Sequence, residues 1–237
     1  MLKNINENYF RMLILGKTGS GKTYFLNNQL LPKLSKKYTM FYIFTTPYNI
    51  DVYKQVLTEL EVPKERQKVM GFTDVSLIPA VIQQIELTIA KDKVDKDSDG
   101  HPIFRDHSLL VFDDILDDKV MSSMEFRGIF TRFRHIQASA IILAQITTKA
   151  VTPAMKGNMN YGVYFQLESQ QMRFAVEMIR DILMSKDIKL TKIKATELAK
   201  KIYIDNVQDH GYVITTDKNE IIVKPKGKTK KKELQLV

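Results

Sequence analysis

The stretch Gly16-Lys17-Thr18-Gly19-Ser20-Gly21-Lys22-Thr23 decides the fold of this chain, because it matches the pattern of a phosphate-binding loop. The apolar run Arg11-Met12-Leu13-Ile14-Leu15 precedes it and predicts a buried strand. A stretch compatible with a helix follows, from Gly21 to about Leu34. Strand, glycine-rich loop and helix in this order form the setting in which a phosphate loop works.

Each residue type in the loop has a physical role toward the phosphates of a nucleotide. The glycines let the backbone curl so that N–H groups point inward, and the following helix adds its positive end. Lys22 is expected to reach the β- and γ-phosphates, and the Thr23 hydroxyl to bind Mg²⁺. We therefore expect ATP and Mg²⁺ as ligands; the alternative is a glycine-rich turn without a ligand.

A second site is expected where the run Leu109-Leu110-Val111-Phe112 ends in Asp113 and Asp114. In proteins with this loop, an acid at a strand end holds Mg²⁺, usually through water. We assign Asp113 to magnesium and Asp114 to orienting or deprotonating the attacking water. The alternative is that two carboxylates simply end a strand.

A polar residue also follows the next predicted strand, Ala138–Ala144. Gln145 stands at its tip, beside the strand that carries the carboxylates. A polar side chain at this place can touch the γ-phosphate or the attacking water, so Gln145 is the candidate sensor. A purely structural role is the alternative for this residue.

The remaining apolar patterns predict strands that alternate with helices. This alternation is typical of an α/β protein with a largely parallel central sheet flanked by helices. The expected strands are 11–15, 40–45, 108–112, 138–144 and 161–166, and the expected helices are 21–34, 50–60, 76–90, 122–134 and 168–185. Segments 211–215 and 220–224 around Asp217-Lys218-Asn219 predict a C-terminal β-hairpin.

Length, composition and charge predict one domain with a basic tail. The chain has 237 residues, 44% of them hydrophobic, which suits a single α/β domain over 1–223. The formal net charge is +9, and six lysines and one glutamate in segment 224–237 account for +5 of it, leaving +4 for the rest. The tail is interpreted either as a contact for a polyanion, nucleic acid first, or as a solvated flexible end.

The chain contains no cysteine, which excludes disulfides, cysteine-ligated zinc and cysteine nucleophiles. This composition fits a reducing compartment. No segment approaches the ~18 apolar residues that a membrane span needs, and residues 1–10 lack the apolar core of a signal peptide. We therefore expect an intracellular protein without a membrane span.

The polar segment 91–107 is predicted to be an exposed loop. Within it, Asp95-Lys96-Asp97-Ser98-Asp99-Gly100 copies the first half of a calcium-binding loop, and Asp106 falls at the twelfth position. Pro102 interrupts the segment, and the last ligand would be Asp where calcium loops carry Glu. A solvated turn is therefore favoured, and calcium binding stays an open alternative.

Several short motifs resemble those of the FtsK–HerA superfamily of DNA-pumping ATPases. They are Gly16–Thr23, Phe112-Asp113-Asp114, Arg134-His135 and Ile142-Leu143-Ala144-Gln145, supported by Thr45-Thr46-Pro47, Pro153 to Asn158 and Tyr212 to Asp217. Within the superfamily, the chain most resembles the poxvirus-type genome-packaging ATPases of large DNA viruses and virophages. The resemblance covers about residues 10–220. It departs from the pattern at Asp114, where many members carry the longer Glu.

The resemblance implies a RecA-like core, a homo-oligomeric ring and ATP-driven translocation of double-stranded DNA into a capsid, with capsid or portal proteins as partners. It also implies an arginine finger that reaches the γ-phosphate held by the neighbouring subunit. Arg134 and Arg132 lie in the matching region and are our candidates, with ordinary helix salt bridges as the alternative. The implied location is the host cytoplasm, a viral factory or the virion.

A DNA motor needs cations that grip phosphates without reading bases. Candidates are the tail Lys224–Lys232, Lys149 and Lys156. Two other functions stay open: a helicase-like motor, and a nucleotide-switched assembly or binding protein with low turnover. Stimulation of hydrolysis by duplex DNA distinguishes a motor from a switch.

Overall fold

A computed structural model describes residues 9–71, 77–92, 107–114, 124–132, 138–145 and 156–224. The chain falls into two compact units. The first contains residues 1–11, 23–143 and 150–158, and the second contains residues 12–22, 144–149 and 159–237. The phosphate loop up to Lys22 belongs to the second unit, and the acidic end of the third predicted strand belongs to the first.

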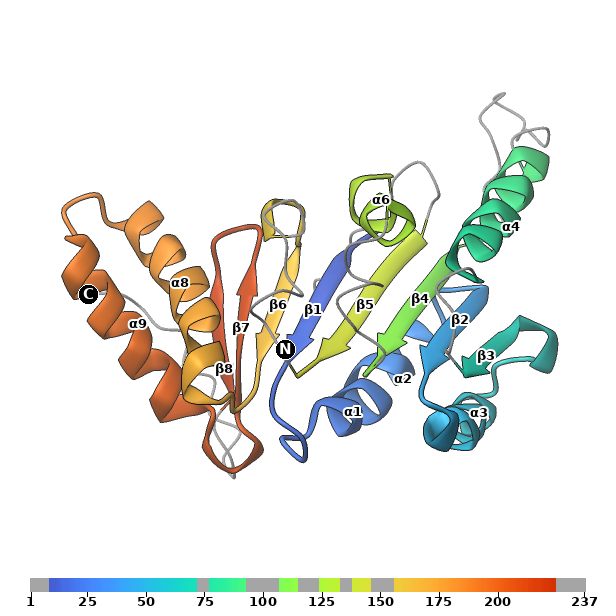
Figure 1. The fold of residues 1–237 in the computed structure, drawn as a ribbon, viewed down its shortest axis with the longest axis horizontal. Coiled ribbons are helices and arrows are strands. Elements are labelled where there is room, and N and C mark those ends of the chain that lie inside the picture. Colours follow the sequence, from blue (N-terminus) through green and yellow to red (C-terminus); the bar gives the residue numbers. More distant parts are fainter. Residues whose placement is uncertain are drawn as a thin grey trace. The chain divides into compact units, whose positions relative to one another are not determined.

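Four parallel strands form the sheet of the first unit, in the order β3-β2-β4-β5 (Figure 1). They are β2 (Met40–Thr45), β3 (Gln67–Gly71), β4 (Ser108–Asp113) and β5 (Ala138–Ala144). Every residue of β4 and β5 is buried, as expected for parallel strands covered on both faces. The register places Asp113 beside Leu143, so β4 and β5 end at the same edge of this sheet.

The helices of the first unit connect these strands. Their bounds are α1 (Lys22–Phe25), the π-helix η1 (Leu26–Leu30), α2 (Leu31–Leu34), α3 (Ile50–Glu59), α4 (Leu77–Asp92) and α6 (Met124–Arg132), with 3-10 turns η2 (Pro47–Asn49) and η3 (Lys64–Arg66). The strand–helix alternation predicted from the sequence is therefore confirmed.

The helix predicted from Gly21 to Leu34 is helical from Lys22 onward, with a π-helical segment in its middle. Pro32 has no N–H, so it cannot donate the hydrogen bond that an uninterrupted α-helix needs there. The π segment Leu26–Leu30 ends just before this proline, and Leu26 and Leu30 remain buried. The interruption thus changes the hydrogen bonding of the helix and leaves its apolar face packed.

The second unit has a mixed sheet in the order β1-β6-β7-β8 (Figure 1). Its strands are β1 (Arg11–Leu15), β6 (Tyr161–Tyr164), β7 (Tyr212–Thr216) and β8 (Ile221–Lys224). β1 and β6 are parallel, whereas β6, β7 and β8 are antiparallel to one another in turn. β7 and β8 are the predicted C-terminal hairpin, and Asn219 takes the left-handed conformation in its turn, with φ +58°.

Within its described residues, the second unit also contains the helices α8 (Ser169–Lys186) and α9 (Lys192–Asn206). They pack side by side as an antiparallel pair (Figure 1). The 3-10 turn η4 (Gln208–His210) joins α9 to β7. α8 was predicted as a helix over 168–185, whereas α9 was not predicted.

The sequence pattern did not indicate β3 or α9, and both omissions have a physical reason. β3 is the half-buried edge of its sheet, so it lacks the continuous apolar run of a central strand. α9 buries Ala195 and Ala199 beside two larger residues, and alanine gives only a weak amphipathic signal.

Several predicted boundaries were wrong by a few residues. The strand expected to reach Gln166 ends at Tyr164, because the chain leaves the sheet there. Lys91 and Asp92 continue α4, although they were assigned to the exposed loop. Lys224, which was assigned both to the hairpin segment 220–224 and to the start of the tail, is the last residue of β8, and its ammonium lies 5.6 Å from the ring centroid of Tyr212.

Some predictions fall on residues that the structure does not describe. The possible calcium loop Asp95–Asp106, the candidate DNA-contacting Lys149 and the tail from Pro225 onward are among them. The single domain over 1–223 stays a prediction. In the described parts of the chain, no helix is both long and apolar enough to cross a membrane.

Candidate active site

The phosphate loop connects β1 to α1 through a backbone path that requires glycine. Gly19 and Gly21 have φ of +73° and +102°, the left-handed region that side chains disfavour. A Cβ on Gly16 would collide with the Ser20 hydroxyl and come within 2.7 Å of Phe165 Cβ. Three glycines of the pattern are thus needed for the conformation of the loop itself.

Backbone hydrogen bonds from the ends of two strands hold the first residues of the loop. The Gly16 N–H donates to the Ala144 carbonyl at 3.2 Å, and the Lys17 N–H donates to the Gln166 carbonyl at 2.8 Å. Within the loop, the Ser20 N–H donates to the Lys17 carbonyl at 3.1 Å. Backbone hydrogen bonds of the protein itself therefore hold the entrance of the loop.

Tyr203 of α9 supports the segment that carries Gln166. Its hydroxyl donates to the Phe165 carbonyl and accepts from the Leu167 N–H, both at 2.8 Å. Burial raises the pKa of Tyr203 to about 12, although the hydrogen bond from Leu167 acts in the opposite direction. This brace links α9, which the sequence pattern did not indicate, to the backbone that holds the loop.

Lys22 places its ammonium inside the loop. The residue is 5% exposed, and its Nζ donates to the carbonyls of Gly16 at 2.8 Å and Lys17 at 3.2 Å. A buried cation is unfavourable unless it is paired or well hydrogen-bonded, and a phosphate in the loop would supply the opposite charge. The Ser20 hydroxyl is also buried and has no hydrogen-bond partner in the structure, so it can donate to such an anion.

The candidate sensor Gln145 contacts the loop directly. The Thr18 hydroxyl donates to Gln145 Oε1 at 2.8 Å, across 127 residues of sequence. Both residues belong to the second unit. The structure therefore brings together two residues that the sequence suggested separately, the third residue of the loop and the polar tip of β5.

His210 is a residue near the loop that the sequence pattern did not suggest. Its Nδ1 lies 3.5 Å from the position that a Cβ on Gly21 would occupy. Asp209 and His210 both have left-handed backbones, with φ of +51° and +64°. Two such non-glycine residues in succession are uncommon, and no short sequence signal marks this turn.

The two carboxylates at the end of β4 lie in different surroundings. Asp113 is fully buried, whereas Asp114 is exposed. Asp114 has φ +53°, and its N–H donates to the Leu143 carbonyl at 3.3 Å. The left-handed turn ends the strand and sends the second carboxylate into solvent, where a carboxylate can meet water. Left-handed non-glycine residues concentrate at functional sites.

Tyr53 of α3 holds the buried carboxylate. Its hydroxyl donates to Asp113 Oδ2 at 2.7 Å, and both residues are 0% exposed. The pKa of Tyr53 is raised above its usual range, first by burial and then by the negative charge of Asp113 and the hydrogen bond to it. Nothing in the sequence pattern connected these two residues, because they are 60 positions apart.

The residues assigned to magnesium offer the ligands that this ion prefers. Thr23, half-buried in α1, carries a hydroxyl, and Asp113 carries a carboxylate. Mg²⁺ is bound by one or two carboxylates together with waters and substrate phosphates. Among the described residues there is no group of three or more His, Cys, Asp or Glu side chains that could hold a metal ion. The chemistry of the two side chains, a hydroxyl and a carboxylate, therefore fits Mg²⁺.

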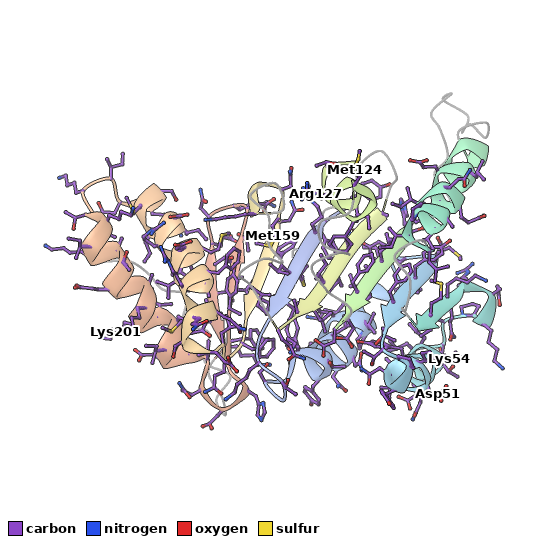
Figure 2. All side chains as sticks on the ribbon, viewed as in Figure 1. Asp51, Lys54, Met124, Arg127, Met159 and Lys201 are labelled. Carbon is purple, nitrogen blue, oxygen red and sulfur yellow. The ribbon has the colours of Figure 1, made fainter. Side chains whose placement is uncertain are left out.

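The structure does not describe the side chains of the candidate arginine fingers. Arg132 is the last residue of α6, but its side chain is not described, and Arg134 lies outside the described residues. On the same helix, Arg127 and Met124 are exposed, and Figure 2 shows them on α6. The roles of Arg132 and Arg134 therefore stay predictions.

A glycine-rich loop around a buried lysine, in an α/β fold that also carries an acidic strand end, defines the class of P-loop ATPases. The family described as Poxvirus A32 protein matches residues 1–230, and the chain belongs to this family. The resemblance to poxvirus-type ATPases is thereby confirmed. No individually curated protein matches the chain.

Solved structures with the same fold include viral packaging proteins and a conjugation coupling protein. The genome packaging NTPase B204 from Sulfolobus turreted icosahedral virus 2, in complex with sulfate, is 15% identical with a TM-score of 0.62, covering 92% of this chain and 97% of that one. The DNA-packaging ATPase B204 from Sulfolobus Turreted Icosahedral Virus is 16% identical with a TM-score of 0.60, covering 91% and 97%. The pCW3 conjugation coupling protein TcpA is 18% identical with a TM-score of 0.51, covering 89% and 58%. These likenesses confirm the predicted P-loop ATPase fold.

Proposed function

We propose that the chain is an ATP-hydrolysing motor that translocates double-stranded DNA during packaging of a viral genome. The observation that carries the proposal is the formed phosphate loop with Lys22 buried inside it. Membership of the poxvirus A32 family supports the viral setting. The names of the structural relatives, a genome packaging NTPase and a DNA-packaging ATPase, support the packaging role.

The loop binds the phosphates of ATP in this proposal. The residues Gly16, Lys17, Thr18, Gly19, Ser20, Gly21, Lys22 and Thr23 surround the phosphate chain, with N–H groups directed inward. Lys22 exchanges hydrogen bonds with loop carbonyls for contacts with the β- and γ-phosphates. The buried Ser20 hydroxyl gains the acceptor that it lacks in the described structure.

Thr23 and Asp113 hold magnesium, and Asp114 acts on the water. Magnesium, when bound, supplies neutralisation of charge on the β- and γ-phosphate oxygens. The Asp113 carboxylate is fully buried, and electrostatic interactions are stronger in a buried position than in water. The exposed Asp114 orients the attacking water or accepts its proton.

Gln145 reports the state of the γ-phosphate. Its side-chain oxygen already accepts a hydrogen bond from Thr18 of the loop, so a change at the loop alters the contact of Gln145. β5 ends next to Gln145, and a rigid strand can carry the change of contact into the protein. This is the coupling that a motor needs between hydrolysis and movement.

The motor works as a homo-oligomeric ring, with Arg134 or Arg132 completing the neighbour's site. An arginine supplied in trans stabilises the charge that develops in phosphoryl transfer. Arg134→Ala subunits are expected to regain activity when mixed with Asp114→Asn subunits, because each supplies what the other lacks. A lack of complementation for both arginines, measured as ATPase activity of the mixture, argues against a finger in trans.

Duplex DNA is gripped by lysines, through phosphates and without base readout. Lys156 is half-buried and belongs to the described residues, whereas Lys149 and most of the tail Lys224–Lys232 do not. Capsid or portal proteins are the further partners of a packaging motor. The relative contribution of each lysine follows from the salt dependence of DNA binding in single variants.

The decisive experiment is steady-state ATP hydrolysis with and without double-stranded DNA, with Lys22→Ala as the blank. Stimulation by duplex that is lost in the variant supports the motor. Slow hydrolysis that ignores DNA supports the nucleotide-switched assembly protein. Stimulation by single strands together with unwinding supports a helicase-like motor.

A further inference from the structure

We propose that Tyr53 is a positioning residue that fixes the carboxylate of Asp113 and thereby sets the affinity for magnesium in the presence of nucleotide. The proposal deepens the function proposed above and rests on the assignment of Asp113 to magnesium. Tyr53 itself touches neither nucleotide nor ion in this proposal. Tyr53 acts through the carboxylate. Its primary effect is therefore on metal binding, and any effect on turnover follows from that.

The contact between the two side chains is short and fully enclosed. The Tyr53 hydroxyl lies 2.7 Å from Asp113 Oδ2, both residues are 0% exposed, and Asp113 Oδ1 is buried as well. A hydrogen bond from a hydroxyl to a carboxylate is stronger than one between neutral groups. The hydrogen bond restricts rotation of the carboxylate about its Cβ–Cγ bond. Because the two oxygens are held in one plane, this restriction also determines where Oδ1 is directed.

The two partners come from elements that pack independently of this bond. Tyr53 and Leu57, one turn apart, are the buried residues of α3, so the ring is held by the apolar face of the helix. Asp113 is held by its place at the end of β4 in a parallel register with β5. The hydrogen bond is therefore an addition to the packing, and removal of the hydroxyl alone leaves the ring and the strand in place.

Other buried tyrosines show what an ordinary core hydroxyl does. The hydroxyl of Tyr164 lies 3.2 Å from the Thr215 hydroxyl, and that of Tyr203 bonds to backbone groups of 165 and 167. These partners are neutral. Among these three tyrosines, Tyr53 alone donates to a carboxylate that has a candidate catalytic role. A phenylalanine would fill the site equally well, so packing does not account for the hydroxyl.

The loss of a contact that orients a metal ligand has an effect of known size on metal binding. Groups that orient metal ligands change metal affinity or activity by about 10- to 100-fold when they are removed. Without the hydroxyl, Asp113 would lose the hydrogen bond that orients its Oδ2. We therefore expect Tyr53→Phe to weaken the affinity for magnesium and to leave the binding of the phosphates by the loop unchanged.

The test measures binding of a fluorescent, non-hydrolysable ATP analogue during titration with MgCl₂, and again in EDTA. Tyr53→Phe is expected to raise the half-saturating Mg²⁺ concentration about tenfold, with the affinity in EDTA unchanged. Tyr164→Phe is the matched control, because it removes the same hydroxyl from another fully buried tyrosine. Equal Mg²⁺ dependence of Tyr53→Phe, the control and the native protein overturns the proposal.

A second variant ensures that the conclusion about the Tyr53 hydroxyl does not depend on Tyr53→Phe alone. Tyr53→Met also lacks the hydroxyl and fills irregular space well, so it is expected to shift the Mg²⁺ midpoint in the same direction. Thermal melting of each variant establishes that the protein compared is folded. A shift in Tyr53→Met that is absent in folded Tyr53→Phe contradicts a role for the hydroxyl.

Asp113→Asn separates failure of this inference from failure of the proposed function. If Asp113→Asn leaves the Mg²⁺ midpoint unchanged, the assignment of Asp113 to magnesium is wrong. If Asp113→Asn shifts the midpoint and Tyr53→Phe does not, only the role of Tyr53 is wrong. The double variant is expected to behave like Asp113→Asn alone, because Tyr53 acts through that carboxylate.

Discussion

The phosphate loop and the acidic end of β4 hold their charged side chains by different means. Lys22 is surrounded by carbonyls of its own loop, five and six residues away. Asp113 is held by Tyr53, which lies 60 residues earlier and on a different element. One charged group thus depends on local backbone, and the other depends on tertiary packing.

This difference predicts which substitutions each site tolerates. The loop needs glycine at positions with left-handed backbone, and it needs the strand ends that hold its entrance. The acidic site needs α3 packed so that Tyr53 reaches Asp113, so changes far from the carboxylates can disturb it. Substitutions can test whether the two sites fail separately.

The largest effect is expected from Lys22→Ala. Removal of a preorganised charge that stabilises the transition state lowers turnover by about 10²–10³-fold. Lys33→Ala, at an exposed lysine of α2, is the control and is expected to retain activity. Steady-state ATP hydrolysis measures both variants. Full turnover in Lys22→Ala would mean that the loop is not the site of hydrolysis.

Asp114→Asn is expected to lower turnover about 100-fold, the lower end of the contribution of a general base. Asparagine tolerates the left-handed backbone at this position, so the fold is retained. Binding of ATP should persist, because the loop is distant from this carboxylate in the sequence and is held by other backbone hydrogen bonds. The control is Asp51→Asn at an exposed residue of α3, labelled in Figure 2. Loss of nucleotide binding in Asp114→Asn would contradict the assigned role.

Thr18→Val and Gln145→Leu test the contact between the loop and the tip of β5. Each is expected to lower turnover up to about tenfold, the equivalent of one hydrogen bond. The double variant should lose little more than either single variant, because both remove the same contact. Thr58→Val is the control, since its hydroxyl bonds only within α3 at Lys54. Fully additive losses would show that the two residues act independently.

The smallest expected effect concerns the loop without nucleotide. Gly21→Ala should lower the free energy of unfolding by about 1–2 kcal/mol, because alanine disfavours a left-handed backbone. Gly157→Ala is the control, since a Cβ there meets nothing within 4 Å. Urea unfolding monitored by circular dichroism compares the two variants. Equal stabilities would show that the loop relaxes without strain.

Much of the fold follows from local patterns in the sequence. The buried strands β1, β2, β4 and β5 each appear as an apolar run, because strands covered on both faces have no polar side. The helical spacing of apolar residues over 76–90 is likewise sufficient to predict α4. β3 and α9 were not predicted, because an edge strand and an alanine-faced helix lack a strong apolar signal.

The sequence by itself determined the phosphate loop, since its function is built from contiguous backbone, three glycines and one lysine. It also placed Asp113, Asp114 and Gln145 at strand ends. Only the tertiary structure decided that Asp113 is buried against Tyr53, that Asp114 turns outward with φ +53°, and that Thr18 meets Gln145. These are contacts between residues distant in the chain, and local periodicity carries no information about which distant side chains will meet.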